Sequence, residues 1–183
     1  AAMERKRAQT AQAFAMQAPG ANTGDLAAIT ILRNIASGMG GRLYNEVREK
    51  NNLAYTVAAY LELNLNGGLL LNYAATSPEN EIKARELMLA EWAKMASGDI
   101  SGQEFETAKR YTLGIYQIGL QSNASVRDQQ AHNILMGRGI EFLEKYIALV
   151  KNAGIEDVKK AAAAFSPSGG IAIGAVRAEP QPE

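Results

Sequence analysis

Arg48 and Tyr55 are the residues of this sequence whose types and spacing best suit the binding of an oxyanion. Periodicity predicts a short helix from Arg42 to about Lys50 and then a strand, so a tight turn can bring the guanidinium and the phenol to one rim of a sheet. A guanidinium holds a carboxylate or peptide carbonyl in a fork, and a phenol donates to charge developing on a tetrahedral intermediate. The strand pattern also groups Tyr55 with Leu53 and Val57, which leaves open that Tyr55 is a core residue.

A zinc site within this chain is not expected. His132 is the only histidine and cysteine is absent, whereas catalytic zinc usually takes three protein ligands, histidine prominent among them. His132 follows Asp128 by one helical turn, which favours a polar-face histidine beside a carboxylate. A triad of Ser125, Asp128 and His132 is rejected because the three lie on one local segment without the glycine pattern of a nucleophile elbow.

Two further patterns give weaker indications of a chemical role. The run Gly38-Met39-Gly40-Gly41 lacks the lysine and hydroxyl residue of a phosphate-binding loop and follows no strand, so it predicts a turn between two helices. Glu46 and Glu49 lie close on the short helix, and such a pair does acid–base work only if burial separates the two pKa values. The short, charged helix favours solvated acids.

The elements around these residues follow from hydrophobic periodicity. We expect a first strand over 9–17, a helix over 25–37, and strands over 53–63 and 69–76. The two later strands are joined at Asn66-Gly67, a dipeptide that tolerates the positive φ angles of a tight antiparallel hairpin.

Capping residues mark the helices that follow. Ser77-Pro78 begins a long helix that Gly98 ends, and Ser101 with Glu104 has the spacing of a capping box. Further helices are expected over 124–136, 140–152 and 155–165, and a last strand over 171–176. Runs of helices beside a few strands predict an α+β two-layer sandwich, a small mixed sheet covered by several helices.

The composition excludes several classes of protein. The 183 residues have the length of one domain, here residues 1–183, and a hydrophobic fraction of 47% is that of an ordinary globular chain. Nineteen basic residues balance 19 acidic ones without a long basic block, which argues against nucleic acid as a partner. The longest apolar runs are far shorter than the roughly 18 residues of a membrane-spanning helix.

The segments Arg42-Leu43, Arg48-Glu49-Lys50 and Leu53-Ala54-Tyr55 resemble the signature of the second half of pitrilysin/insulinase-type zinc peptidases, the inverzincins. The resemblance implies two similar α+β domains that face each other like a clamshell. The first holds zinc through a His-x-x-Glu-His helix whose glutamate is the general base. The second lacks the metal site and contributes an arginine and a tyrosine seven positions apart, the spacing of Arg48 and Tyr55.

The resemblance therefore implies that this chain is the non-metal half of a bacterial zinc metallopeptidase, inactive by itself and without a cofactor of its own. Its expected partners are a peptide substrate and a zinc-bearing N-terminal half-domain, in the same or a separate chain. Such a protein is expected to be soluble, in a bacterial cytoplasm or periplasm. The alternatives are a catalytically inactive scaffold or assembly subunit, as among relatives in respiratory complexes, and an unrelated α+β peptide-binding module.

Overall fold

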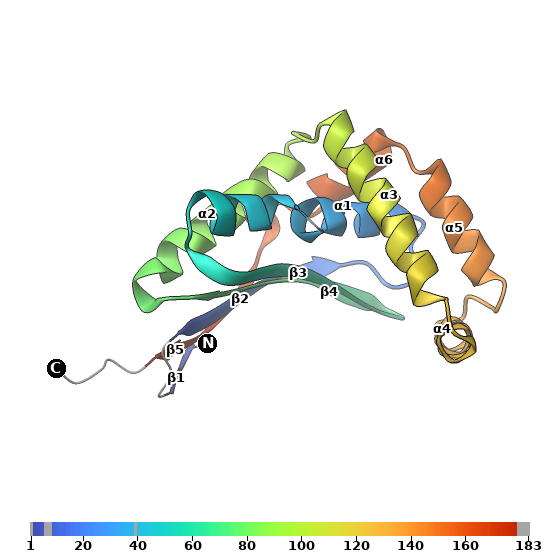
Figure 1. Ribbon diagram of the computed structural model, residues 1–183, viewed down its shortest axis with the longest axis horizontal. Helices are drawn as coiled ribbons and strands as arrows, with labels where there is room; N and C mark the ends of the chain where they lie inside the picture. Colours follow the sequence, from blue (N-terminus) through green and yellow to red (C-terminus); the bar gives the residue numbers. More distant parts are fainter. Residues whose placement is uncertain (1, 6–8, 39, 179–183) are drawn as a thin grey trace.

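The computed structural model describes residues 2–5, 9–38 and 40–178 (Figure 1). Five strands form one sheet in the order β1, β5, β2, β4, β3, with β1 parallel to β5 and the other neighbours antiparallel. Their bounds are β1 Ala2–Arg5, β2 Thr10–Ala18, β3 Ala54–Asn64, β4 Gly67–Thr76 and β5 Ala172–Ala178. The mixed sheet is confirmed, and so is the expectation that it joins the hairpin, the first predicted strand and the last one. Strand β1 was not predicted.

The helices cover one face of this sheet (Figure 1). They are α1 Leu26–Ser37, α2 Glu81–Ala96, α3 Gly102–Gly119, α4 Asn123–Leu135, α5 Phe142–Asn152, α6 Ile155–Ala163, the π-helix η1 Tyr44–Lys50 and the 3₁₀ turns η2 Pro78–Asn80 and η3 Pro167–Gly169. The capping box of Ser101 and Glu104 begins α3 as predicted, and Gly98 follows α2 with a φ of 87°. This arrangement confirms the α+β two-layer class. No helix in the described ranges is long and apolar enough to cross a membrane.

The core lies between the sheet and the helices. Alternate residues of β2 are buried against the helical layer, and the apolar stripe of α2 packs on the same side, as Ala84, Met88, Trp92 and Met95 are fully buried. Trp92 also ties this helix to the sheet, because its Nε1 donates to Oδ1 of the buried Asn72 at 2.7 Å. Burial of one stripe per element thus fixes how the helices sit on the strands.

The other face of the sheet carries no helix formed by the described residues (Figure 1). We call it the open face; the register places on it Ala11, Ala13 and Ala15 of β2, Leu69, Leu71 and Tyr73 of β4, and Thr56, Ala58 and Tyr60 of β3. Leu69 is 47% exposed and Tyr60 is 50% exposed. The open face is therefore built mostly of small and apolar side chains, and the strand at its outer edge is β3.

The hairpin of β3 and β4 is confirmed, but its predicted turn is wrong in detail. The turn residues are Leu65 and Asn66, and neither Asn66 nor Gly67 has a positive φ. The glycine that the hairpin needs is Gly68, where a Cβ would lie 2.4 Å from the carbonyl oxygen of Glu62. Close packing of backbone, rather than turn geometry, explains glycine at that position.

Candidate functional site

The site begins with the reversal of the chain between η1 and β3. The predicted short helix is present, but from Tyr44 to Lys50 it is wound as a π-helix, a rare form that recurs at functional sites. The N–H of Leu53 then donates to the carbonyl of Val47 at 2.9 Å. Asn52 has a φ of 50°, the only positive value at a non-glycine residue in the described ranges, and so turns the chain back into β3.

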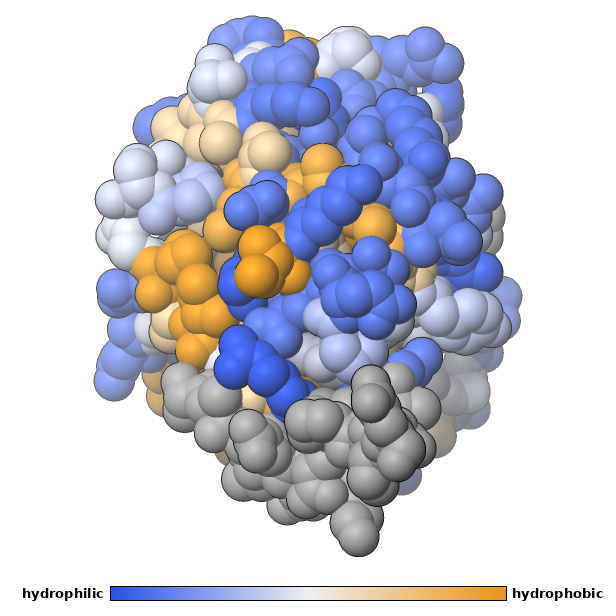
Figure 2. Space-filling view, turned by 90° about the vertical axis from the view of Figure 1, so that its left-hand side faces the viewer, coloured by the Kyte–Doolittle hydropathy of each residue, from blue (hydrophilic) through white to orange (hydrophobic). Residues whose placement is uncertain are grey.

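This reversal brings Arg48 and Tyr55 together. Nη1 of Arg48 donates to the carbonyl oxygen of Tyr55 at 3.1 Å, and the guanidinium carbon lies 4.7 Å from the centroid of the Tyr55 ring and 5.0 Å from that of Tyr44. Nε of Arg48 lies 3.8 Å from Oε1 of Glu49. Figure 2 views the end of the molecule at which η1 and the start of β3 lie, and apolar residues there adjoin polar ones.

A β-bulge directs Tyr55 outward. Ala54 pairs with Thr76 and Thr56 pairs with Ala75, so Tyr55 is the extra residue of β3. The side chain is 75% exposed, and the interpretation of Tyr55 as a core residue is wrong. A bulge shifts the alternation of a strand by one residue, which explains why the simple pattern grouped Tyr55 with buried neighbours.

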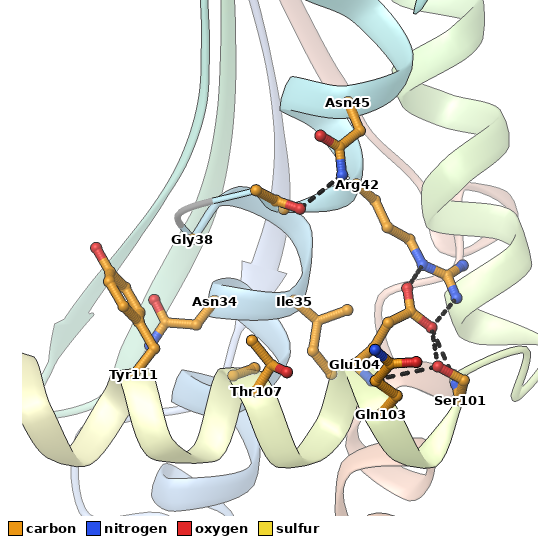
Figure 3. A pocket seen from close by; sticks show the side chains of 13 residues that line it. Asn34, Ile35, Gly38, Arg42, Asn45, Ser101, Gln103, Glu104, Thr107 and Tyr111 are labelled. Carbon is orange, nitrogen blue, oxygen red and sulfur yellow. Dashed lines mark hydrogen bonds and ion pairs between the residues drawn. The ribbon is translucent and has the colours of Figure 1, made fainter. Parts of the chain in front are cut away.

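Arg42 anchors the start of the short helix to α3 (Figure 3). Its Nε donates to Oε1 of Glu104 at 2.6 Å and its Nη2 to Oε2 at 2.9 Å, while Nη2 also reaches the carbonyl of Asp99 at 2.6 Å. The hydrogen bond from Arg42 is the main cause that lowers the pKa of Glu104 to about 2, against the opposing effect of burial. The same hydrogen bond raises the pKa of Arg42. This partly buried pair fixes where η1 leaves the helical layer.

A hollow of about 250 Å³ lies beside this anchor, between the end of α1 and the start of α3 (Figure 3). Several of its polar groups bond to one another, since Asn45 Nδ2 donates to the carbonyl of Gly40 at 2.7 Å and Glu104 accepts from Ser101. The described part of the glycine run, residues 38, 40 and 41, joins α1 to the next helix as predicted, and Met39 lies outside the described residues. We assign the hollow to the anchoring of η1.

The remaining sequence candidates do not converge. Asp128 pairs with Arg127 at 2.7 Å, Ser125 Oγ lies 2.8 Å from Ser122 Oγ, and His132 is exposed on α4, so no triad forms.

The acids of the short helix have different partners. Glu46 pairs with Lys50 and its side chain is 26% exposed, whereas the side chain of Glu49 is 55% exposed, so the expectation of a solvated acid is met by Glu49 and not by Glu46. In the described part of the chain no group of three or more His, Cys, Asp or Glu side chains is placed to hold a metal ion.

Sequence reasoning missed Tyr44, although its ring lies against the guanidinium of Arg48. The available signal was the spacing of four residues on one helix, which puts two side chains on the same side.

Fold and site define a class of protein: an α+β half-domain with an open, apolar sheet face and an exposed Arg–Tyr pair at one end of the sheet. The sequence model of the family described as "Peptidase M16 inactive domain" matches residues 2–112. The match covers more than half of the chain, and the chain belongs to this family. The resemblance to the non-metal half of the pitrilysin/insulinase-type peptidases is thereby confirmed.

Relatives and solved structures agree with this assignment. The chain is 26% identical over 154 residues to the uncharacterized zinc protease YmxG of Bacillus subtilis, covering 78% of this chain and 38% of that protein. A peptidase M16 inactive domain from Pseudomonas fluorescens superposes with a TM-score of 0.85 at 22% identity, over 97% of this chain and 42% of that one.

A chain of the Complex III2 structure from Candida albicans superposes with a TM-score of 0.82 at 17% identity, over 96% of this chain and 45% of that one. These two structural matches show the fold. The chain spans 24% to 38% of the length of the first curated relatives with which it aligns.

Proposed function

We propose that this chain, acting as a single domain over residues 1–183, is the substrate-enclosing half of a two-domain zinc metallopeptidase. Its open face forms one wall of a chamber, and Arg48 and Tyr55 contribute to the reaction there. The observation that carries the proposal is the exposed Arg–Tyr pair: a bulge turns Tyr55 outward to 75% exposure while Arg48 lies against its ring.

The open face supports the enclosing role. A sheet with one helical layer leaves an apolar face in water unless another surface covers it, and exposed apolar patches mark interaction sites. Leu69 and Tyr60 are about half exposed on this face, between alanines of β2 and β3. A second half-domain facing this wall would shield it and leave space between the two walls for an extended peptide.

The chemistry of the pair suits hydrolysis of a peptide bond. A cation and a phenol held at one place can donate to the carbonyl oxygen of the scissile bond and stabilise the negative charge that develops on it. Zinc, held by the His-x-x-Glu-His helix of the partner half, would supply an activated water and polarise the same carbonyl. Arg48 and Tyr55 bind and orient the substrate; they hold no metal.

The second candidate is a catalytically inactive scaffold or assembly subunit of the same fold. The observation that favours it is the similarity of the chain to a subunit of the Complex III2 structure from Candida albicans. A His-x-x-Glu-His sequence upstream in the same gene, or in a neighbouring gene, would favour the peptidase. Its absence from both would favour the scaffold.

The decisive experiment is to assemble this half with its zinc-bearing partner and measure hydrolysis of a quenched peptide. Oxyanion donors typically contribute about 3 kcal/mol, so Arg48→Ala and Tyr55→Phe should each slow turnover about a hundredfold. Arg127→Ala, at an exposed arginine on α4, is the matched control and should leave turnover unchanged. Turnover that survives in both site variants would reject the catalytic role and favour the scaffold.

A further inference from the structure

Tyr44 is a third member of the site to which neither the sequence pattern nor the family resemblance assigns a role. It is the first residue of η1 and lies four positions before Arg48, so the two side chains share one side of the helix. The centroid of its ring lies 5.0 Å from the guanidinium carbon, close to the 4.7 Å of Tyr55. Arg48 therefore contacts two aromatic rings from two different elements.

The contacts of Arg48 leave a defined set of donors for a ligand. A guanidinium has five N–H groups. One on Nη1 donates to the carbonyl of Tyr55, and Nε faces Glu49 at 3.8 Å. The other N–H groups on the Nη side are those that a carbonyl or carboxylate of a peptide would meet. Their direction depends on how the guanidinium plane is held.

Glu49 links Tyr44 to the same arrangement. The neighbouring Glu49 carboxylate, through its interaction with the Tyr44 hydroxyl, is the main cause that raises the pKa of Tyr44. The two residues are five positions apart, which is the hydrogen-bonding period of a π-helix. An α-helical turn here would space these side chains differently, so the π-helix itself belongs to the arrangement.

We propose that Tyr44 is a positioning residue: its ring lies against Arg48, whose Nε faces Glu49 on the same helix, and these contacts orient the guanidinium toward a peptide carbonyl or carboxylate. The proposal rests on the proposed function of Arg48. Its physical basis is that stacking on an aromatic face restricts the many rotamers of an arginine and so preserves the direction of its donors.

The orientation can be measured in the chain by itself, without a partner. Protons of Arg48 near an aromatic ring carry a ring-current shift in NMR spectra, and their signals are assigned by their loss in Arg48→Lys. Tyr44→Phe keeps the ring and should retain most of the shift, whereas Tyr44→Leu should move the signals toward solvent-exposed values. Glu49→Ala, at a side chain that is 55% exposed, should move the Arg48 signals part of the way toward solvent-exposed values. Tyr111→Leu, at a half-buried tyrosine of α3, is the matched control and should leave the Arg48 signals unchanged.

In the assembly with the zinc-bearing half, Tyr44→Leu should lower kcat about fivefold, equivalent to about 1 kcal/mol, while Tyr44→Phe stays near wild type. Arg48 signals that do not respond to Tyr44→Leu would overturn the proposal, as would a kcat no lower than that of Tyr111→Leu. If Arg48→Ala also leaves turnover unchanged, the proposed function fails, and the NMR comparison still decides whether Tyr44 orients Arg48.

Discussion

A guanidinium held against aromatic rings keeps its N–H groups directed outward in its own plane, whereas a solvated arginine samples many rotamers. Arg48 has two such rings beside it and a hydrogen bond to the backbone of Tyr55. The entropy of ordering this side chain is therefore largely lost during folding rather than on contact with a ligand. Pre-organisation of this kind makes the later interaction more favourable.

At the residue scale, Tyr55→Phe should leave the free energy of unfolding within about 0.5 kcal/mol of wild type, because the hydroxyl belongs to a side chain that is 75% exposed. Tyr146→Phe is the control: this tyrosine is 8% exposed, and burial of its hydroxyl, which interacts with Thr30, raises its pKa. It should cost about 1 kcal/mol. Urea denaturation measures both, and a destabilised Tyr55→Phe would show that this phenol serves the fold.

The proximity of Arg48 and Tyr55 was predictable from sequence, since a helix, a short turn and a strand leave few other arrangements. The outward direction of Tyr55 was not, because a bulge shifts the phase of β3 without a mark in residue types. The π-helix was also not predictable, because its hydrogen-bond register differs from that of an α-helix by only one residue.

At the element scale, the short helix depends on the ion pair of Arg42 and Glu104. The folded pKa of Glu104 is about 2, below its ordinary 4.5, so its contribution is fully present above pH 4.5 and is lost as the pH falls toward 2. Because the Glu104 side chain is 35% exposed, solvent screening reduces that contribution to about 1–2 kcal/mol.

Glu104→Gln keeps a residue suited to the capping box but removes the charge. Wild type should exceed this variant in unfolding free energy at pH 7, and the difference should shrink between pH 4.5 and pH 2. Urea titrations at several pH values test this. A difference that stays constant with pH would assign the effect to something other than the carboxylate charge.

Helix α2 is held on the sheet by the buried hydrogen bond from Trp92 to Asn72. Asn72→Leu removes the acceptor and leaves the indole N–H without its partner, which should cost about 1–3 kcal/mol. Asn152→Leu, at an exposed position, is the matched control and should be nearly neutral. Equal stability of the two variants in thermal denaturation would mean that packing alone positions α2.

Most elements were predictable because their signals are local: alternation in β3 and β4, the caps at Ser101 and Gly98, and the buried stripe of α2. Strand β1 was not, since it is four residues long and pairs with β5, about 170 positions later in the chain. A short edge strand of that kind is specified by its partner rather than by its own sequence.

At the scale of the whole molecule, the chain by itself should hold no stoichiometric zinc and show no chelator-sensitive hydrolysis of a quenched peptide. One histidine and no cysteine cannot supply the usual ligand set. Metal analysis of the purified protein, with the assembled enzyme as positive control, checks the first statement. One zinc ion per chain would overturn the assignment of this half as the non-metal partner.

Strand β3 closes one side of the sheet with eleven residues, and in the described part of the chain no other strand pairs with its outer side. Proteins usually guard such an edge with lysine, proline or a bulge. Here the bulge lies at the start of β3, between Ala54 and Thr56, and Glu62 is the only charged residue of the strand. When produced without its partner, this half should self-associate through β3 as concentration rises, an aggregation hazard that assembly with the other half would reduce if it covers that edge.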